Sequence, residues 1–186
     1  ELPKLSQNIE YEVVRPQEDW KQLIDGEIEY IKSEEKVSRL IFPGTFNPLH
    51  EGHLKIKELA EEKTQEELVF EISVSNVDKS PLSFYEIKKT IDQFSDDQQW
   101  ILTNASTFQQ KVKLFPKSIF VVGTDTLMRI FDEQYYQDQT TMNQALDCFN
   151  EYDARFIVFG REINKNFLSL DDIEIPSFVR DRFKGV

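Results

Sequence analysis

Short, continuously apolar runs alternate along this chain with stretches of helical periodicity. Leu40-Ile41-Phe42 and Ile119-Phe120-Val121-Val122 contain no polar residue, as expected for strands covered on both faces of a parallel sheet. Repeated strand–helix–strand units favour parallel strands joined by crossover helices. We therefore expect a single α/β domain with a Rossmann-like, doubly wound parallel sheet of about five strands. The expected strands are Arg39–Phe42, Leu68–Val74, Trp100–Thr103, Ile119–Val122 and Phe156–Phe159.

Helical patterns fill most of the intervals between these strands. One of them is preceded by Ser83-Phe84-Tyr85-Glu86, a capping-box pattern that satisfies the free backbone N–H groups at a helix start. The expected helices are His53–Lys63, Phe84–Phe94, Thr107–Leu114, Thr126–Phe131 and Met142–Asn150.

The first 36 residues are polar and acidic. Apolar residues between Asp19 and Ile31 recur at helical spacing around Gly26. We interpret residues 1–36 as a leader helix or linker and residues 37–186 as the main domain. The chain begins with Glu1, so we expect it to be part of a longer protein. The expected location is intracellular, with the choice between cytoplasm and an organelle left open.

Composition excludes several classes of function. The 186 residues include 34 acidic and 22 basic side chains, a formal net charge of -12. This balance argues against a nucleic-acid partner, because phosphate neutralisation needs clustered Lys and Arg. Cys148 is the one cysteine, which excludes an internal disulfide framework and a cysteine-based zinc site. No apolar run approaches the roughly 18 residues of a membrane span.

Three of the expected strands run directly into loops that contain glycine. These loops are Pro43-Gly44-Thr45, Gly123-Thr124-Asp125 and Gly160-Arg161. If the sheet is parallel, all three loops lie at its carboxyl edge, where ligands of open α/β sheets bind. The sequence therefore predicts a ligand site at this edge.

The two histidines of the chain, His50 and His53, follow the first of these loops. An isolated His-x-x-His pair is compatible with ordinary surface or core residues. The strand end before it, and Gly52 between the histidines, favour a functional site. A helical zinc pair prefers an i, i+4 spacing with a nearby Glu, so we expect no metal site. The segment is neither a Walker A loop nor a G-x-G-x-x-G fingerprint.

The chemistry of this segment suits phosphate. Gly44 allows a turn off the strand and a close approach of backbone N–H groups to an anion. His53 opens the next helix, where the positive end of the helix dipole favours phosphate. Imidazoles there can donate hydrogen bonds to phosphate oxygens and stabilise the charge on a transferring phosphoryl group.

The segment from Gly44 to His53 resembles the signature of the nucleotidylyltransferase superfamily, with its H-x-G-H element at His50, Gly52 and His53. Asn76-Val77-Asp78-Lys79 and Gly123-Thr124-Asp125-Thr126-Leu127 are similar to the acceptor-side loop and the G-x-D loop of nicotinamide or nicotinate mononucleotide adenylyltransferases. The run from Phe70 to Lys79 is similar to a cytidylyltransferase-like branch that often carries an upstream CinA-like domain.

The resemblance implies transfer of a nucleotidyl group from ATP or CTP to a phosphate-bearing small-molecule acceptor, with release of pyrophosphate. Mg²⁺ is expected to arrive with the nucleoside triphosphate and to need few protein ligands. The leading hypothesis is adenylyl transfer from ATP to nicotinamide or nicotinate mononucleotide, as in NAD biosynthesis. Two alternatives stay open: CTP or another acceptor, and a catalytically degenerate structural or assembly subunit of a larger complex.

The same resemblance implies roles for individual residues. His50 and His53 are the expected catalytic residues. Lys79 and Arg161 can also be ordinary surface residues, and Asp125 can serve only to begin a helix. The expected nucleotide- or phosphate-binding residues are Gly44, Thr45, Phe46, Gly52, Gly123, Asp125 and Arg161; the expected acceptor-binding residues are Asn76, Asp78 and Lys79.

An anionic protein that binds a triphosphate needs a locally positive cleft. We therefore expect Lys79, Lys88, Lys89 and Arg161 to cluster near His50. The bulky aromatic residues Trp100, Phe115 and Phe120 are expected in the core.

The sequence departs from the superfamily at its carboxyl-terminal end. The superfamily usually closes with an I-S-S-T-x-I-R element whose hydroxyls and arginine hold the triphosphate. Ile175-Pro176-Ser177-Phe178-Val179-Arg180 offers at best a Ser and an Arg in compatible places. Either the element lies outside this sequence or the protein has lost a phosphate clamp.

Overall fold

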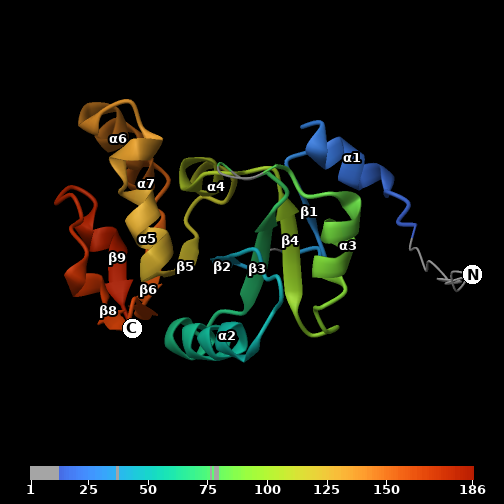
Figure 1. Ribbon diagram of the computed structural model, residues 1–186, viewed down its shortest axis with the longest axis horizontal. Coiled ribbons are helices and arrows are strands. Elements are labelled where there is room, and N and C mark those ends of the chain that lie inside the picture. The colour runs from blue at the N-terminus through green and yellow to red at the C-terminus, as the bar shows by residue number, and fades with distance from the viewer. Residues whose placement is uncertain (1–12, 37, 76, 78–79) are drawn as a thin grey trace, which may run out of the picture.

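The computed structural model describes residues 13–36, 38–75, 77 and 80–186. A seven-stranded sheet runs through it in the order β1-β4-β3-β2-β5-β6-β9, which can be followed across Figure 1. All neighbours in this sheet are parallel except β1, which pairs antiparallel with β4. A separate hairpin of β7 (Arg161–Ile163) and β8 (Asn166–Leu168) follows β6. The strands of the main sheet are β1 (Tyr30–Lys32), β2 (Leu40–Pro43), β3 (Leu68–Ser73), β4 (Gln99–Thr103), β5 (Ile119–Gly123), β6 (Arg155–Phe159) and β9 (Phe183–Gly185).

Helices cover both faces of the sheet. Alternate residues of each central strand enter different cores: in β5, Phe120 packs toward α4 to α7, whereas Val121 packs toward α1 to α3. This two-sided burial explains why the strands are continuously apolar. The helices are α1 (Glu18–Ile24), α2 (Glu51–Thr64), α3 (Phe84–Ile91), α4 (Phe108–Leu114), α5 (Thr124–Ile130), α6 (Gln139–Leu146) and α7 (Cys148–Glu151), with 3₁₀ turns at Glu133–Tyr135, Leu170–Asp172 and Arg180–Arg182.

The expected α/β architecture is confirmed, and all five expected strands form. The sheet gains two edge strands, β1 and β9, which the sequence did not reveal because each has only three residues. The expected helix Asp19–Ile31 ends at Ile24, since Gly26 adopts a left-handed φ of 75° and the chain then turns into β1. The expected helix Met142–Asn150 is divided into α6 and α7.

The strand order reverses between β2 and β5. From β2 the chain proceeds outward through β3 to β4, and from β5 it proceeds outward in the other direction through β6 to β9. Adjacent strands that lead in opposite directions leave a crevice at their carboxyl ends, where ligands bind in doubly wound sheets. The loops that follow Pro43 and Gly123 therefore flank the crevice.

The described part of the leader segment packs against the main domain. The side chain of Asn104, after β4, donates hydrogen bonds to the carbonyl oxygens of Leu23 and Ile24 at 3.1 and 3.4 Å. Trp20 stacks on Phe84 of α3, with ring centroids 6.4 Å apart. The boundary near residue 36 remains a prediction. Within the leader segment, β1 is an edge strand of the sheet and α1 packs on one face of it.

Within the described residues, no helix combines the length and apolar character needed to cross a bilayer.

Replacing Phe156 with Ala should strongly destabilise the fold. Its ring is 1 % exposed and packs against Phe149 and Phe183, with centroids 4.8 and 4.6 Å away. Large-to-small changes of this kind cost about 3–5 kcal/mol, measurable by urea unfolding. Phe167→Ala is the matched control, because its ring is 69 % exposed and the expected change is within about 0.5 kcal/mol. Equal losses in the two variants would contradict this packing.

Candidate active site

A cavity of about 490 Å³ lies at the crevice between β2 and β5 and extends over the ends of β3 and β6. The structure brings together in its wall all the expected site residues that it describes. Their roles remain predictions, but their convergence follows directly from the parallel sheet. These residues are Gly44, Thr45, Phe46, His50, Gly52, His53, Gly123, Asp125 and Arg161.

The loop after β2 is anchored by Phe46. This residue has a φ of 42° and is 1 % exposed, so its ring lies in the core beneath the loop. A Cβ atom at Gly44 would approach Phe46 Cζ to 2.6 Å, which explains the need for glycine there. The expected contribution of Phe46 to phosphate binding can therefore come from its backbone, while its side chain packs on Phe42 and Phe70.

Gln93, which follows α3, fixes the other half of this loop. Its Nε2 donates to the carbonyl oxygen of Phe46 at 2.9 Å, and its Oε1 accepts from the backbone N–H of Leu49 at 2.7 Å. The peptide bond between Asn47 and Pro48, between these two anchors, is cis. The two hydrogen bonds of Gln93 fix the conformation in which the loop enters α2.

His50 and His53 stack on each other at the start of α2. Their ring centroids are 3.7 Å apart and the rings are inclined by 22°. His50 is the residue before the helix, and His53 lies in its first turn. A Cβ atom at Gly52 would lie 3.0 Å from Cε1 of His50, closer than side chains normally pack. Glycine between the histidines therefore lets the His50 ring lie against the helix start.

His53 is a neutral hydrogen-bond donor in this arrangement. Burial of its ring, followed by the nearby charges of His50 and Arg161, lowers the pKa of His53 from 6.5 to about 4. The backbone N–H of His50 donates to His53 Nδ1 at 3.3 Å. Since Nδ1 accepts, the proton of the neutral ring lies on Nε2, which can donate to an anionic ligand.

Asp125 and Arg161 form an ion pair in the cavity wall. Arg161 Nη1 lies 2.6 Å from Asp125 Oδ2, and both side chains are partly exposed. Asp125 Oδ1 is buried and has no hydrogen-bond partner among the described residues. It packs over Gly123, where a Cβ atom would clash with it. An unpartnered carboxylate oxygen of Asp125 therefore lies next to the guanidinium of Arg161 at the edge of the cavity.

Several residues of the cavity wall were not expected from the sequence. They include the buried ion pair of Glu71 and Lys111, as well as Phe108 and Arg129. Glu71 carried a detectable signal, because it is a charged residue in the otherwise apolar run Leu68–Ile72. The other residues follow from the packing of α4 and α5, which the sequence does not specify.

The expected cluster of positive charge is partly wrong. Arg161 lies in the cavity, but Lys88 and Lys89 line a different cavity of about 200 Å³ with Asp92. Both lysines point there because they lie on the outer side of α3, where Lys88 pairs with Asp92. Asn76, Asp78 and Lys79 lie outside the described residues.

Arg180, the one arginine in the segment compared with the phosphate clamp, has local partners. It donates to the carbonyl oxygen of Phe183 at 3.2 Å and pairs with Asp171 at 3.4 Å. It does not line the cavity at the histidines.

A smaller cavity of about 210 Å³ opens beside the main one, and we call it the aromatic annex. Phe108, Tyr135 and Tyr136 contribute aromatic rings to it. The Tyr136 hydroxyl donates to the carbonyl oxygen of Ile130 at 2.9 Å and accepts from Gln109 at 2.8 Å. Burial raises the pKa of Tyr136. The annex and the main cavity share Ser106, Phe108, Thr126 and Arg129.

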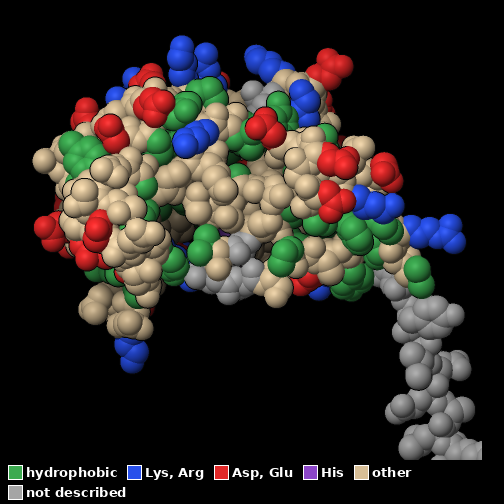
Figure 2. Space-filling model, turned by 90° about the horizontal axis from the view of Figure 1, so that it is seen from above, with side chains coloured by type: hydrophobic (Ala, Val, Ile, Leu, Met, Phe, Trp, Pro, Cys, Tyr) green, Lys and Arg blue, Asp and Glu red, His purple; other side chains and the backbone are tan. Residues whose placement is uncertain are grey.

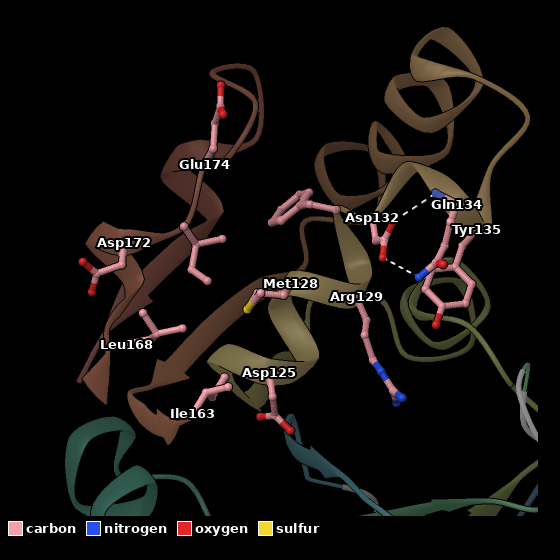
Figure 3. A pocket seen from close by; sticks show the side chains of 12 residues that line it. Asp125, Met128, Arg129, Asp132, Gln134, Tyr135, Ile163, Leu168, Asp172 and Glu174 are labelled. Atoms are coloured by element: carbon pink, nitrogen blue, oxygen red, sulfur yellow. Dashed lines mark hydrogen bonds between the residues drawn. The ribbon is translucent and has the colours of Figure 1, made fainter. Parts of the chain in front are cut away.

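A third cavity, of about 680 Å³, lies between α5, the β7–β8 hairpin and residues 172–174. Figure 3 shows Asp125 and Met128 of α5 on one side and Ile163 and Leu168 of the hairpin on the other. Its described lining includes four carboxylates against the guanidinium of Arg129, which disfavours a phosphate ligand. The carboxylates belong to Asp125, Asp132, Asp172 and Glu174.

On the face drawn in Figure 2, acidic and basic side chains are interspersed, without a broad basic patch on that face. Across the part of the chain that the structure describes, no group of three or more His, Cys, Asp or Glu side chains is placed to hold a metal ion.

Comparison with protein families matches residues 41–173 to the family described as cytidylyltransferase-like. The matched range covers more than half of the chain and includes every residue of the main cavity. Comparison with curated proteins gave no match.

His53 should titrate near pH 4 in the ligand-free protein, as followed by NMR of its imidazole carbon-bound protons. Between pH 6.5 and about 4, the unfolded chain binds a proton at His53 that the folded chain does not. The contribution of His53 to stability should therefore be present above pH 6.5 and be lost as the pH falls toward 4.

His50→Gln is the informative companion variant, because it removes one of the charges that lower the pKa of His53. The pKa of His53 should rise part of the way toward 6.5, and burial should keep it below that value. A midpoint for His53 above pH 6 in the unsubstituted protein would contradict the geometry.

Gln93→Ala should loosen the loop that precedes α2. Each of the two lost hydrogen bonds is worth about 1 kcal/mol, and hydrogen exchange of the Leu49 amide should accelerate accordingly. Gln65→Ala is a suitable control, because Gln65 is exposed and bonds only locally, to the carbonyl oxygen of Glu62. Unchanged exchange at Leu49 would show that Gln93 does not hold the loop.

Proposed function

We propose a nucleotidyl transfer reaction for this chain, which belongs to the cytidylyltransferase-like family. Membership in this family supports a nucleotidyltransferase activity in general. The specific reaction that we propose is adenylyl transfer from ATP to nicotinamide or nicotinate mononucleotide, with release of pyrophosphate. Its main support is the convergence of His50, His53 and the Asp125–Arg161 pair on one cavity beside the loop at Gly44.

In this reaction, a phosphate oxygen of the acceptor attacks the α-phosphorus of the nucleoside triphosphate. A new phosphorus–oxygen bond forms, the bond from the α-phosphorus to its bridging oxygen breaks, and pyrophosphate leaves with that electron pair. A protein nucleophile is not required. Cys148, the one thiol of the chain, is buried in the core, and its pKa is raised to about 11, chiefly by burial.

Hydrogen bonding to the reacting phosphates is assigned to the two histidines. Nε2–H of neutral His53 donates to a phosphate oxygen, and His50 lies against the same helix start. The N-terminus of the 14-residue helix α2 adds its positive dipole end. Donors fixed before the reaction stabilise the developing charge without further reorganisation.

Asp125 and Arg161 exchange partners in the proposed complex. Asp125 Oδ1 is an unpartnered acceptor and suits a ribose hydroxyl. Arg161 is partly exposed and beside His53, so its guanidinium can turn from Asp125 to a phosphate oxygen. Mg²⁺ would arrive with the triphosphate and would supply positive charge that offsets the charge of the leaving pyrophosphate.

The aromatic annex favours an acceptor that carries a flat ring close to a phosphate. Phe108, Tyr135 and Tyr136 contribute rings to its wall, and offset or edge contacts between rings contribute about 0.5–1.5 kcal/mol beyond burial. Ser106 and Arg129, at the junction with the main cavity, are polar groups of the kind that hold a phosphate. A pyridine mononucleotide combines these two parts.

A catalytically degenerate structural or assembly subunit is the second candidate. The observation in its favour is that Arg180 bonds to Phe183 and Asp171 instead of lining the cavity. CTP in place of ATP, or another acceptor, are variations of the leading proposal. Measurements of nucleotidyl transfer with different nucleotides and acceptors distinguish these candidates.

Incubation with ATP, Mg²⁺ and either pyridine mononucleotide should yield the dinucleotide and pyrophosphate in equal amounts, as measured by chromatography and a coupled pyrophosphate assay. His50→Ala or His53→Ala should lower the rate by about 10²–10³-fold, as for loss of a fixed charge-stabilising donor. Lys89→Ala is the control variant, because Lys89 lines the separate cavity on α3.

Each alternative predicts a distinct result. Turnover with CTP but not ATP, or with another phosphate-bearing acceptor only, would replace the proposed substrates. Nucleotide binding without pyrophosphate release from any acceptor would support the structural candidate. Equal rates for the histidine variants and the unsubstituted protein would contradict the assigned site.

A further inference from the structure

A buried ion pair forms part of the floor of the main cavity. Glu71, on β3, is 1 % exposed, and Lys111, on α4, is 6 % exposed. Lys111 Nζ donates to Glu71 Oε1 and Oε2 at 2.6 and 2.7 Å. Both residues line the cavity that also contains His50 and His53.

The hydrogen bonds of this pair are fully satisfied. The third donor of the Lys111 ammonium bonds to the carbonyl oxygen of Ala105 at 2.8 Å, so all three N–H groups have protein partners. Glu71 Oε1 also accepts from the hydroxyl of Thr103 at 2.5 Å. Lys111 would have to leave these partners to bind a phosphate, so its role is to position other groups.

The group that the pair holds is the turn between β4 and α4. Ala105 uses its carbonyl oxygen for Lys111 and its N–H for the hydroxyl of Thr103, at 3.3 Å. The next residue, Ser106, and the first residue of α4, Phe108, line both the main cavity and the aromatic annex. The far side of the turn is held separately by Gln110, whose Oε1 accepts from the backbone N–H of Ser106.

We propose that Glu71 and Lys111 are positioning residues for the acceptor. By fixing Ala105, they hold Ser106 and Phe108 at the junction where the phosphate and the ring of the acceptor meet. The inference rests on the proposed function, because it takes the annex as the acceptor side of the site. The triphosphate side, at His53 and Arg161, does not depend on the pair.

The energetics of the pair agree with such a role. A buried ion pair is costly to desolvate and often adds little to stability compared with apolar side chains of similar size. Its charges cancel, so Glu71 does not repel an anionic substrate from the cavity floor. Loss of one partner alone would leave an uncompensated buried charge, and single variants are therefore expected to unfold readily.

The test uses the double variant E71Q/K111M, which removes both charges together, with Arg182→Met/Asp153→Asn as the control. The control pair, with Arg182 Nη1 2.6 Å from Asp153 Oδ1, lines neither the main cavity nor the annex. Equilibrium binding of nicotinamide mononucleotide and, separately, of ATP is measured by calorimetry. Circular dichroism first establishes that each variant is folded.

The expected result is a Kd for nicotinamide mononucleotide raised by about 10-fold, because Ser106 and Phe108 would no longer be held in place before the ligand binds. The Kd for ATP should stay within about 2-fold, and the control pair should change neither. A purely structural role would leave both constants unchanged in a folded double variant, or would weaken both together. Either pattern would overturn the inference.

Failure of the proposed function has a different signature. If the unsubstituted protein binds the mononucleotide but transfers no nucleotidyl group to it, the proposed reaction is wrong, and the two binding constants still decide the role of the pair. If it binds ATP but no pyridine mononucleotide, both the acceptor assignment and this inference fail.

Discussion

The reversal of strand order between β2 and β5 is the constraint on which the rest of the structure depends. Because both faces of the sheet are covered by helices, the strands contribute almost only apolar side chains, and polar groups collect at the strand ends. The reversal parts the loops at Gly44 and Gly123 and leaves a crevice between them. Residues from five strands and three helices converge there, although the sequence separates some of them by more than a hundred positions.

Local contacts then give this crevice its chemical character. The chain carries a net charge of -12, and the described wall of the cavity contains three cationic side chains, those of Lys111, Arg129 and Arg161. Lys111 is fully paired with Glu71, Arg161 is paired with Asp125, and His53 is neutral. The polarity of the site comes largely from groups that are fixed in direction: the start of α2, the stacked imidazoles and the loop held by Gln93.

Much of the fold and part of the site could be predicted from the sequence, for physical reasons that differ between elements. The buried strands could be predicted because burial on both faces requires continuous apolar runs. The histidine segment could be predicted because the only two histidines of the chain flank a glycine directly after a strand end. The edge strands β1 and β9 were missed because three residues carry too little periodicity. Lys88 and Lys111 are both lysines on helices, and only packing decides that one faces solvent and the other Glu71.

The neutral state of His53 has a consequence for how an anion is recognised. An uncharged imidazole attracts a phosphate only at hydrogen-bond distance and in the direction of its N–H, whereas a guanidinium attracts it from several ångströms in any direction. In the proposed complex, Arg161 would therefore guide the approach of a phosphate once it turns from Asp125, and His53 would discriminate between correctly and incorrectly seated phosphates. Added salt screens the first of these two effects and leaves the second almost untouched.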